Sequence, residues 1–403
     1  MKPWSSLLAP TLLLSLAQLS LCDSLVRLPV HQRNFSLPTP FRAWSTLVRR
    51  GFVPDTPTAM QLTDVGKDIE YYAEVTVGTP GQVFRLDLDT GSADLWIYTQ
   101  QDFQKKARLV KERKATPRRK ERRKAEWHQM FNAERSATFR ATGDPWIIHY
   151  VDGSYVRGAV GVDTVELGGI NVRQQTIGLA TEASKEFKDD VVDGVLGLGF
   201  QEISRLKAPP LFQNMISQKL VPNPVFSIFL GRQSEGGGGE IIFGGADSRY
   251  YTGALTYVPL VQAKYWTIDI DRLTVGNEKL IGPSKAVLDT GSTVIALPKE
   301  YLPKVHASLF PGSVHDDRLG WLVPCNPPKT KSQLTFWISG KEFKVPHRDL
   351  IREQVKSRDG YCFSSLVGTK DGVWLLGVAF LKSHYIVYDV GNLRVGLAPA
   401  AQA

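Results

Sequence analysis

The sequence contains few of the residue types on which metal and disulfide chemistry depend. Among its 403 residues there are 3 cysteines and 7 histidines. None of them shows the ligand spacing of a zinc site. This scarcity excludes a small scaffold held by many disulfides and a protein built around structural metal ions. We expect no metal and no other cofactor.

Long apolar runs are equally scarce. One short Leu-rich run, from Leu7 to Leu21, is interrupted by Pro10 and ends beside the small residue Cys22. A run of this length is too short to span a bilayer and is typical of a secretory signal peptide, predicted for residues 1–22. The C-terminus lacks the hydrophobic tail of a lipid-anchor signal. We therefore expect a soluble secreted protein, with a vacuolar location as the second choice.

Positive charge in excess is confined to one segment. The formal net charge is +9, and the stretch from Lys105 to Glu126 alone holds 12 Lys/Arg and 3 Glu. The rest of the chain is neutral by the same count, so we expect no nucleic-acid partner. Three interpretations of the segment stay open: a solvated insert, a site of proteolytic processing, or contact with an anionic surface.

Composition changes along the chain and indicates its domains. Residues 23–66 are polar and Pro-rich and contain Arg49-Arg50, so we interpret them as a propeptide with a candidate dibasic processing site after Arg50. Asn34 begins the chain's only N-glycosylation sequon. The remainder is long enough for two cores, predicted as an N-terminal lobe over 67–246, with the basic insert at 105–126, and a C-terminal lobe over 247–403.

The pattern after the propeptide is that of a β protein. The stretches 72–77 and 83–88 alternate apolar and polar residues, and the 35 glycines indicate many turns. A hairpin is predicted around Asp152-Gly153. Helices are predicted only over 211–220 and 299–309.

One four-residue motif occurs twice. Asp-Thr-Gly-Ser stands at 89–92 and again at 289–292, each time after an apolar run. Two carboxyl groups held within hydrogen-bond reach cannot both ionise, so such a pair shares one proton. The ionised partner can take a proton from water while the protonated partner donates to a carbonyl oxygen. Asp89 and Asp289 are therefore the candidate catalytic pair.

A second internal echo supports a duplicated architecture. Val195-Leu-Gly197 follows the first motif, and Leu375-Leu-Gly377 follows the second. Two apolar residues and a glycine suit a strand that passes close to each Asp loop, where a side chain would clash. The motif and its echo are farther apart in the first half of the chain than in the second, by about the length of the basic segment.

These motifs resemble those of the pepsin-like aspartic endopeptidases, most closely the secreted fungal ones. The resemblance extends from about residue 71 to 400 and includes the stretches 88–96, 193–198, 287–293 and 374–377. It implies an all-β, bilobal double β-barrel with a catalytic cleft between the lobes. It also implies a zymogen that hydrolyses peptide bonds in proteins at acid pH, as a monomer by default.

The resemblance also assigns roles to individual residues. Asp89 and Asp289 would form the dyad. Cys325 and Cys362 would form the disulfide of the second lobe. The remaining positions fall into two sets: the active-site loops (Thr90, Gly91, Ser92, Thr290, Gly291, Ser292), and the flap with its indole partner (Tyr150, Asp152, Gly153, Ser154, Trp96).

The roles within these sets are specific. The threonines would tie the two loops together, and Ser92 would hydrogen-bond the outer oxygen of Asp89. Asp152, Gly153 and Ser154 would bond the peptide backbone of the substrate. Asp87, two residues before Asp89 on the same strand face, is expected to accept a supporting hydrogen bond.

The sequence departs from the family pattern at two positions. Val151 replaces the usual glycine after the flap tyrosine, where a side chain would stiffen the flap or narrow access. Val378 replaces an acidic residue near the second glycine motif, and we expect the acid limb of the pH profile to shift. The alternative function is a non-catalytic binding or inhibitor protein on the same fold, which the two intact motifs disfavour.

Overall fold

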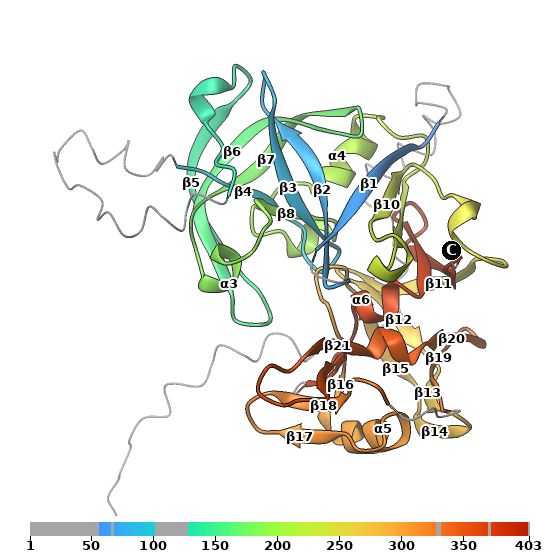
Figure 1. The fold of residues 1–403 in the computed structure, drawn as a ribbon. Coiled ribbons are helices and arrows are strands. Elements are labelled where there is room, and N and C mark those ends of the chain that lie inside the picture. The colour runs from blue at the N-terminus through green and yellow to red at the C-terminus, as the bar shows by residue number, and fades with distance from the viewer. Residues whose placement is uncertain (1–55, 66–67, 101–127, 328–331, 370–371, 402–403) are drawn as a thin grey trace, which may run out of the picture. The chain divides into compact units, whose positions relative to one another are not determined.

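The computed structural model describes residues 56–65, 68–100, 128–327, 332–369 and 372–401. The predicted signal peptide, Asn34, Arg50 and the basic segment from Lys105 to Glu126 lie outside these residues. Strands account for about half of the described chain, far more than helices (Figure 1). The predicted all-β, bilobal pepsin-like class is confirmed.

The first Asp-Thr-Gly-Ser motif connects strand β3 to strand β4, and both of these strands pair with β8. Strand β3 pairs in parallel with β8, β8 pairs antiparallel with β4, and β4 pairs in parallel with β7. An antiparallel β2–β3 pair lies on one side of this arrangement and the β5–β6–β7 meander on the other. The strands are β2 (Glu70–Val77), β3 (Gln82–Asp89), β4 (Leu95–Tyr98), β5 (Arg140–His149), β6 (Tyr155–Leu167), β7 (Ile170–Ala183) and β8 (Gly194–Gly197).

The second motif repeats this arrangement. Strand β15 pairs in parallel with β24, β24 antiparallel with β16, and β16 in parallel with β23. The duplication expected from the two glycine echoes is therefore present in the strand pairing. The strands are β12 (Trp266–Ile270), β15 (Ser284–Leu288), β16 (Ile295–Pro298), β23 (Leu366–Thr369) and β24 (Trp374–Leu376). The lobe boundary at 246 stays a prediction.

Strands from both halves of the chain form one antiparallel array. Its order is β1, β10, β9, β25, β26 and β11. Strand β1 lies within the predicted propeptide, yet its residues Met60 and Leu62 are buried. The strands are β1 (Thr58–Val65), β9 (Val225–Leu230), β10 (Gly239–Phe243), β11 (Thr256–Ala263), β25 (His384–Asp389) and β26 (Arg394–Pro399).

Two four-stranded sheets complete the described strands. They are β14 (Glu278–Ile281), β13 (Arg272–Val275), β19 (Leu334–Ile338) and β20 (Lys341–Val345), and β17 (Val314–Asp316), β18 (Gly320–Pro324), β22 (Tyr361–Ser364) and β21 (Ile351–Gln354). The predicted disulfide between Cys325 and Cys362 is present and links the end of β18 to β22. The two cysteines are 37 residues apart. Closing a loop of that length stabilises the fold by about 3–4 kcal/mol in the chain-entropy account.

Helices are few, as predicted. They are α3 (Lys185–Lys188), α4 (Leu211–Ser217), α5 (Leu302–Leu309) and α6 (Val378–Leu381). Helix α4 ends earlier than expected because Lys219 adopts a left-handed conformation, with φ of 59°. Short 3-10 turns are η1 (Ala133–Arg135), η2 (Gln201–Ile203), η3 (Gln233–Glu235), η4 (Ser248–Tyr250), η5 (Lys299–Tyr301) and η6 (His347–Leu350). Within the described ranges, no helix has the length and apolar character needed to cross a membrane.

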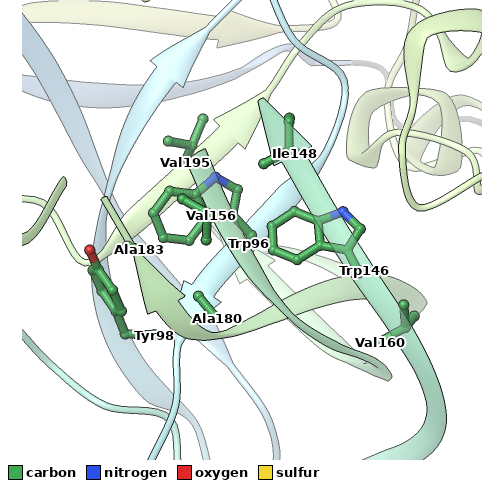
Figure 2. Close-up of a cluster of buried hydrophobic side chains, with 9 residues drawn as sticks. All are labelled: Trp96, Tyr98, Trp146, Ile148, Val156, Val160, Ala180, Ala183 and Val195. Atoms are coloured by element: carbon green, nitrogen blue, oxygen red, sulfur yellow. The ribbon is translucent and has the colours of Figure 1, made fainter. Parts of the chain in front are cut away.

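One aromatic cluster of the first half supports the strands around Asp89. Trp96 and Trp146 lie at its centre, with apolar side chains from β6, β7 and β8 packed around them (Figure 2). Both indoles are almost completely buried, at 0% and 4% exposure. Burial of side chains this large contributes roughly 2–3 kcal/mol each, which makes the cluster a rigid support for the loop that follows β3.

A buried histidine in β25 makes stability depend on pH. His384 bonds the carbonyl of Phe380 through Nδ1 and stacks on the Phe380 ring at 4.3 Å. Burial lowers its pKa from 6.5 to about 4, although the Phe380 carbonyl acts in the opposite direction. The unfolded chain therefore binds more protons than the folded chain between these values, and stability present above pH 6.5 is lost as the pH falls toward 4.

We expect the variant His384→Asn to lose less stability on acidification than the parent protein. An amide does not titrate, so the loss in unfolding free energy between pH 7 and pH 4 should shrink by about 3 kcal/mol. Denaturant unfolding at both pH values measures it. The control is His315→Asn, because the His315 side chain is 52% exposed. Identical pH dependence in parent and His384→Asn would contradict the assignment.

Candidate active site

Equivalent strand ends place the two aspartates. Asp89 is the last residue of β3, and Asp289 follows β15 directly. The carbonyl of Asp89 accepts a bond from Leu198 beyond β8, and the N–H of Asp289 donates to Leu376 of β24. A Cβ on Gly197 would lie 2.4 Å from a backbone nitrogen, and one on Gly377 2.1 Å from a carbonyl oxygen. Glycine is therefore required at both echoes by close backbone approach, as predicted.

The two threonines join the loops to each other. The N–H of Thr90 donates to Oγ1 of Thr290 at 3.0 Å, and the N–H of Thr290 donates to Oγ1 of Thr90 at 3.0 Å. Each hydroxyl then donates to a carbonyl of the opposite strand, that of Leu288 or Leu88. The predicted reciprocal bonding is present, and it holds together two loops that are 200 residues apart in sequence.

The glycines of the motifs let the carboxyl groups approach. Gly91 N–H donates to Asp89 Oδ1 at 2.8 Å, and Gly291 N–H donates to Asp289 Oδ1 at 3.0 Å. A Cβ added to Gly91 would lie 2.6 Å from Asp289 Oδ1, and one added to Gly291 would lie 2.5 Å from Asp89 Oδ1. Each carboxyl thus packs directly against the glycine of the other loop, with no room for a side chain between them.

Burial and proximity keep a proton on this pair. Asp89 and Asp289 are only 6% and 8% exposed. Burial, followed by the charge of Asp89, raises the pKa of Asp289 from 3.8 to about 7, against the opposing hydrogen bond from Ser292. A carboxyl that stays protonated when an isolated aspartate would ionise can act as a general acid.

Two supporting roles differ from expectation. The Ser92 hydroxyl is buried and has no hydrogen-bond partner among the described residues, so the predicted bond to Asp89 is wrong in this structure. The equivalent Ser292 does bond its aspartate, from Oγ to Asp289 Oδ2 at 2.7 Å. Asp87 was expected to accept a bond, but its buried Oδ1 accepts none from the described chain. Burial and neighbouring carboxylates raise the pKa of Asp87, which disfavours the ionised acceptor form.

The predicted flap is a tight hairpin between β5 and β6. Tyr150 N–H donates to the Ser154 carbonyl, and Gly153 N–H donates to the Tyr150 carbonyl. Gly153 has φ of 91°, which suits glycine at this turn position. Asp152 Oδ1 accepts bonds from both the N–H and the hydroxyl of Ser154. Val151 is fully exposed, so its side chain does not stiffen the hairpin by packing against it.

Tyr150 is oriented by Trp96, as predicted. The indole N–H of Trp96 donates to the Tyr150 hydroxyl at 2.8 Å. Phe187 of α3 contacts both rings, with centroids 5.1 Å from Tyr150 and 5.3 Å from Trp96. Phe187 has no signal in the sequence, because it lies 37 residues beyond Tyr150 in a short polar helix that carries no motif.

Val378, which stands where the family pattern has an acidic residue, lies beside the second active-site loop. Val378 begins α6, is completely buried, and donates its N–H to the Ser292 carbonyl at 2.7 Å. Beside the second loop the chain therefore presents an apolar group. In the part of the chain that the structure describes, no cluster of three or more His, Cys, Asp or Glu side chains could hold a metal ion.

Comparisons with known proteins agree with this geometry. Residues 70–400 match the family described as eukaryotic aspartyl protease. Rhizopuspepsin of Rhizopus chinensis is 36% identical, covering 87% of this chain and 84% of its own length. Syncephapepsin of Syncephalastrum racemosum is 33% identical, covering 93% and 91%. Human gastricsin is 32% identical, covering 83% and 82%.

Proposed function

Because the chain belongs to the eukaryotic aspartyl proteases and is an aspartic-type endopeptidase, we propose that it cleaves proteins at acid pH through Asp89 and Asp289. The observation that supports this most is the mutual packing of each carboxyl against the other loop's glycine. The reciprocal threonine bonds preserve that approach. Two carboxyl groups so placed supply a base and an acid to one substrate.

The geometry supports direct attack by water. Asp289 carries the shared proton, and Asp89 in its ionised form takes a proton from a water molecule as that water attacks the scissile carbonyl carbon. Asp289 donates its proton to the carbonyl oxygen, which gives a neutral tetrahedral diol. Asp89 then gives the proton it took from water to the amide nitrogen, while Asp289 takes a proton back from a diol hydroxyl. The C–N bond breaks, and the amine and carboxylic acid products leave. No covalent bond to the enzyme forms.

The flap supplies the means to hold an extended peptide. The exposed turn at residues 151–153 has backbone groups that can bond a substrate strand, which is how extended peptides are commonly recognised. We expect the enzyme to prefer substrates with large apolar side chains on both sides of the cleaved bond, as pepsin-like enzymes do. Protein or peptide substrates follow from the family, and a secreted monomer is part of the proposal.

We further propose synthesis as a zymogen, with the propeptide ending before β1 rather than at residue 66. Strand β1 (Thr58–Val65) pairs with both β10 and β2, so cleavage after 66 would remove an integral strand. We expect the mature N-terminus between residues 51 and 57. Intact-mass and N-terminal analysis of the secreted protein would establish the position. A mature enzyme that begins after Val65 would contradict this boundary.

The direct test of the proposed function is hydrolysis of acid-denatured globin by the secreted protein from pH 3 to pH 6. Activity that requires acid and is blocked by a statine-containing peptide, which imitates the tetrahedral species, is the expected result. Absence of hydrolysis by protein whose propeptide has been removed would overturn the proposal and favour a binding role.

A further inference from the structure

Asp94 collects hydrogen bonds from two distant segments. It lies in the loop between β3 and β4 and is only 2% exposed. Its Oδ1 accepts from the Ser204 hydroxyl at 2.7 Å and from Leu206 N–H at 3.3 Å. Its Oδ2 accepts from Arg205 N–H at 2.9 Å and from the indole N–H of Trp146 at 3.3 Å. A carboxylate offers about four acceptor positions, and all are used here.

The Trp146 bond differs from the other three because it comes from the flap. Trp146 belongs to β5, the strand that leads into the hairpin, and lies on the same strand face as Tyr150. Its ring lies beside Trp96 in the buried cluster (Figure 2). A Cβ on Gly178 would lie 3.0 Å from both the Trp146 ring and Trp96 Cβ. The absence of a side chain at Gly178 therefore leaves room for the Trp146 ring and for Cβ of Trp96.

Two indole bonds of opposite direction fasten the flap to the active-site loop. Trp96 donates from β4 to Tyr150 in the hairpin. Trp146 donates from the hairpin strand to Asp94, two residues before Trp96. Both attachments therefore reach the same short stretch after the catalytic loop. The Trp146–Asp94 bond ties the strand that leads to Tyr150 to this stretch.

We propose that Asp94 is a positioning residue for peptide hydrolysis, which acts through Trp146 to set the flap strand so that Tyr150 meets Trp96. A carboxylate suits this position because three of its neighbours are N–H donors and the fourth, the Ser204 hydroxyl, also donates. An asparagine would place its NH₂ group against at least one of the N–H donors and leave that donor unpaired. The inference rests on the proposed hydrolase function.

The test compares two donors to the same carboxylate. Trp146→Phe removes the donor on the flap strand, and Ser204→Ala removes a donor that lies outside the flap. We expect Trp146→Phe to raise KM for an extended peptide about fivefold, with kcat within about twofold, because it weakens substrate binding by the flap and leaves the dyad intact. Ser204→Ala should change KM by less than about twofold. Asp94→Asn should resemble Trp146→Phe.

A fourth variant separates the effect of the hydrogen bond from that of the ring volume. Incorporation of 3-benzothienylalanine at position 146 keeps both rings and replaces the N–H with sulfur. It should raise KM as Trp146→Phe does, even if the phenylalanine variant is too unstable to assay. Equal KM changes for the Ser204 and Trp146 variants, or no change with benzothienylalanine, would overturn the inference. An inactive parent protein would instead refute the proposed function, so the two failures are distinguishable.

Discussion

Replacement of Asp289 by asparagine should lower kcat by about 10²- to 10⁴-fold, the range expected for the loss of a general acid. The pKa of Asp289 is raised to about 7, chiefly by burial and then by the charge of Asp89, so this carboxyl holds the proton that reaches the scissile carbonyl oxygen. An amide retains the shape and, on its single oxygen, the bond from Gly291 N–H. Its NH₂ group can meet the Ser292 hydroxyl only as a donor, and it cannot transfer the proton to the substrate. Steady-state kinetics on a peptide substrate would measure the loss.

The matched control for this variant is Asp269→Asn. Asp269 lies in β12, its side chain is 69% exposed, and it pairs with Lys285. The same chemical change there should leave kcat within about twofold, because exposed ion pairs contribute little. Asp289→Asn should also remain at least as stable as the parent, since it removes a buried group that resists ionisation. A fully active Asp289→Asn enzyme would contradict the dyad.

A single methyl group added between the two active-site loops should cause the second-largest loss in kcat. In Gly291→Ala the new Cβ would lie 2.5 Å from Oδ1 and 2.7 Å from Cγ of Asp89. Carbon and oxygen do not approach so closely, so the carboxyl groups must separate. Misplacement of reacting groups by about 1 Å costs on the order of 10²-fold in rate, and we expect a loss of that size in kcat.

The pH dependence of Gly291→Ala identifies the cause of its loss. Carboxyls that are moved apart repel each other less, so the raised pKa of the pair should fall toward that of an isolated aspartate. The control is Gly282→Ala, because no atom lies within 4 Å of its added Cβ. That variant should retain parental kinetics. Parental kcat and an unchanged pH profile in Gly291→Ala would show that the loops do not meet as described.

The features that the sequence predicted are those with a local or repeated signal. Alternation of apolar residues located β2 and β3, and the repeated Asp-Thr-Gly-Ser located both carboxyls. The glycine echoes at Gly197 and Gly377 anticipated close backbone packing because only a missing side chain permits it. The reciprocal threonine bonds followed from the resemblance, since nothing in the residue pattern alone indicates that Thr90 faces Thr290.

The features that were missed depend on contacts between distant residues. Asp94 receives its bonds from residues 52 and 110–112 positions away, and no periodic pattern connects them. Ser92 and Ser292 follow the same three residues, Asp-Thr-Gly. Only Ser292 bonds its aspartate, because hydroxyl orientation is decided by tertiary packing. The early end of α4 at Ser217 reflects the left-handed backbone of Lys219, which lysine rarely adopts and which its sequence does not announce.

The pH dependence of kcat/KM for the mature enzyme tests the central claim most directly. If Asp89 and Asp289 share one catalytic proton, activity should be present while the pair holds it and be lost as the pH rises through the raised pKa, which is about 7 for Asp289. Asp289→Asn should lose this dependence together with most of the activity. Activity that persists undiminished to pH 9, or parental activity in Asp289→Asn, would contradict the account.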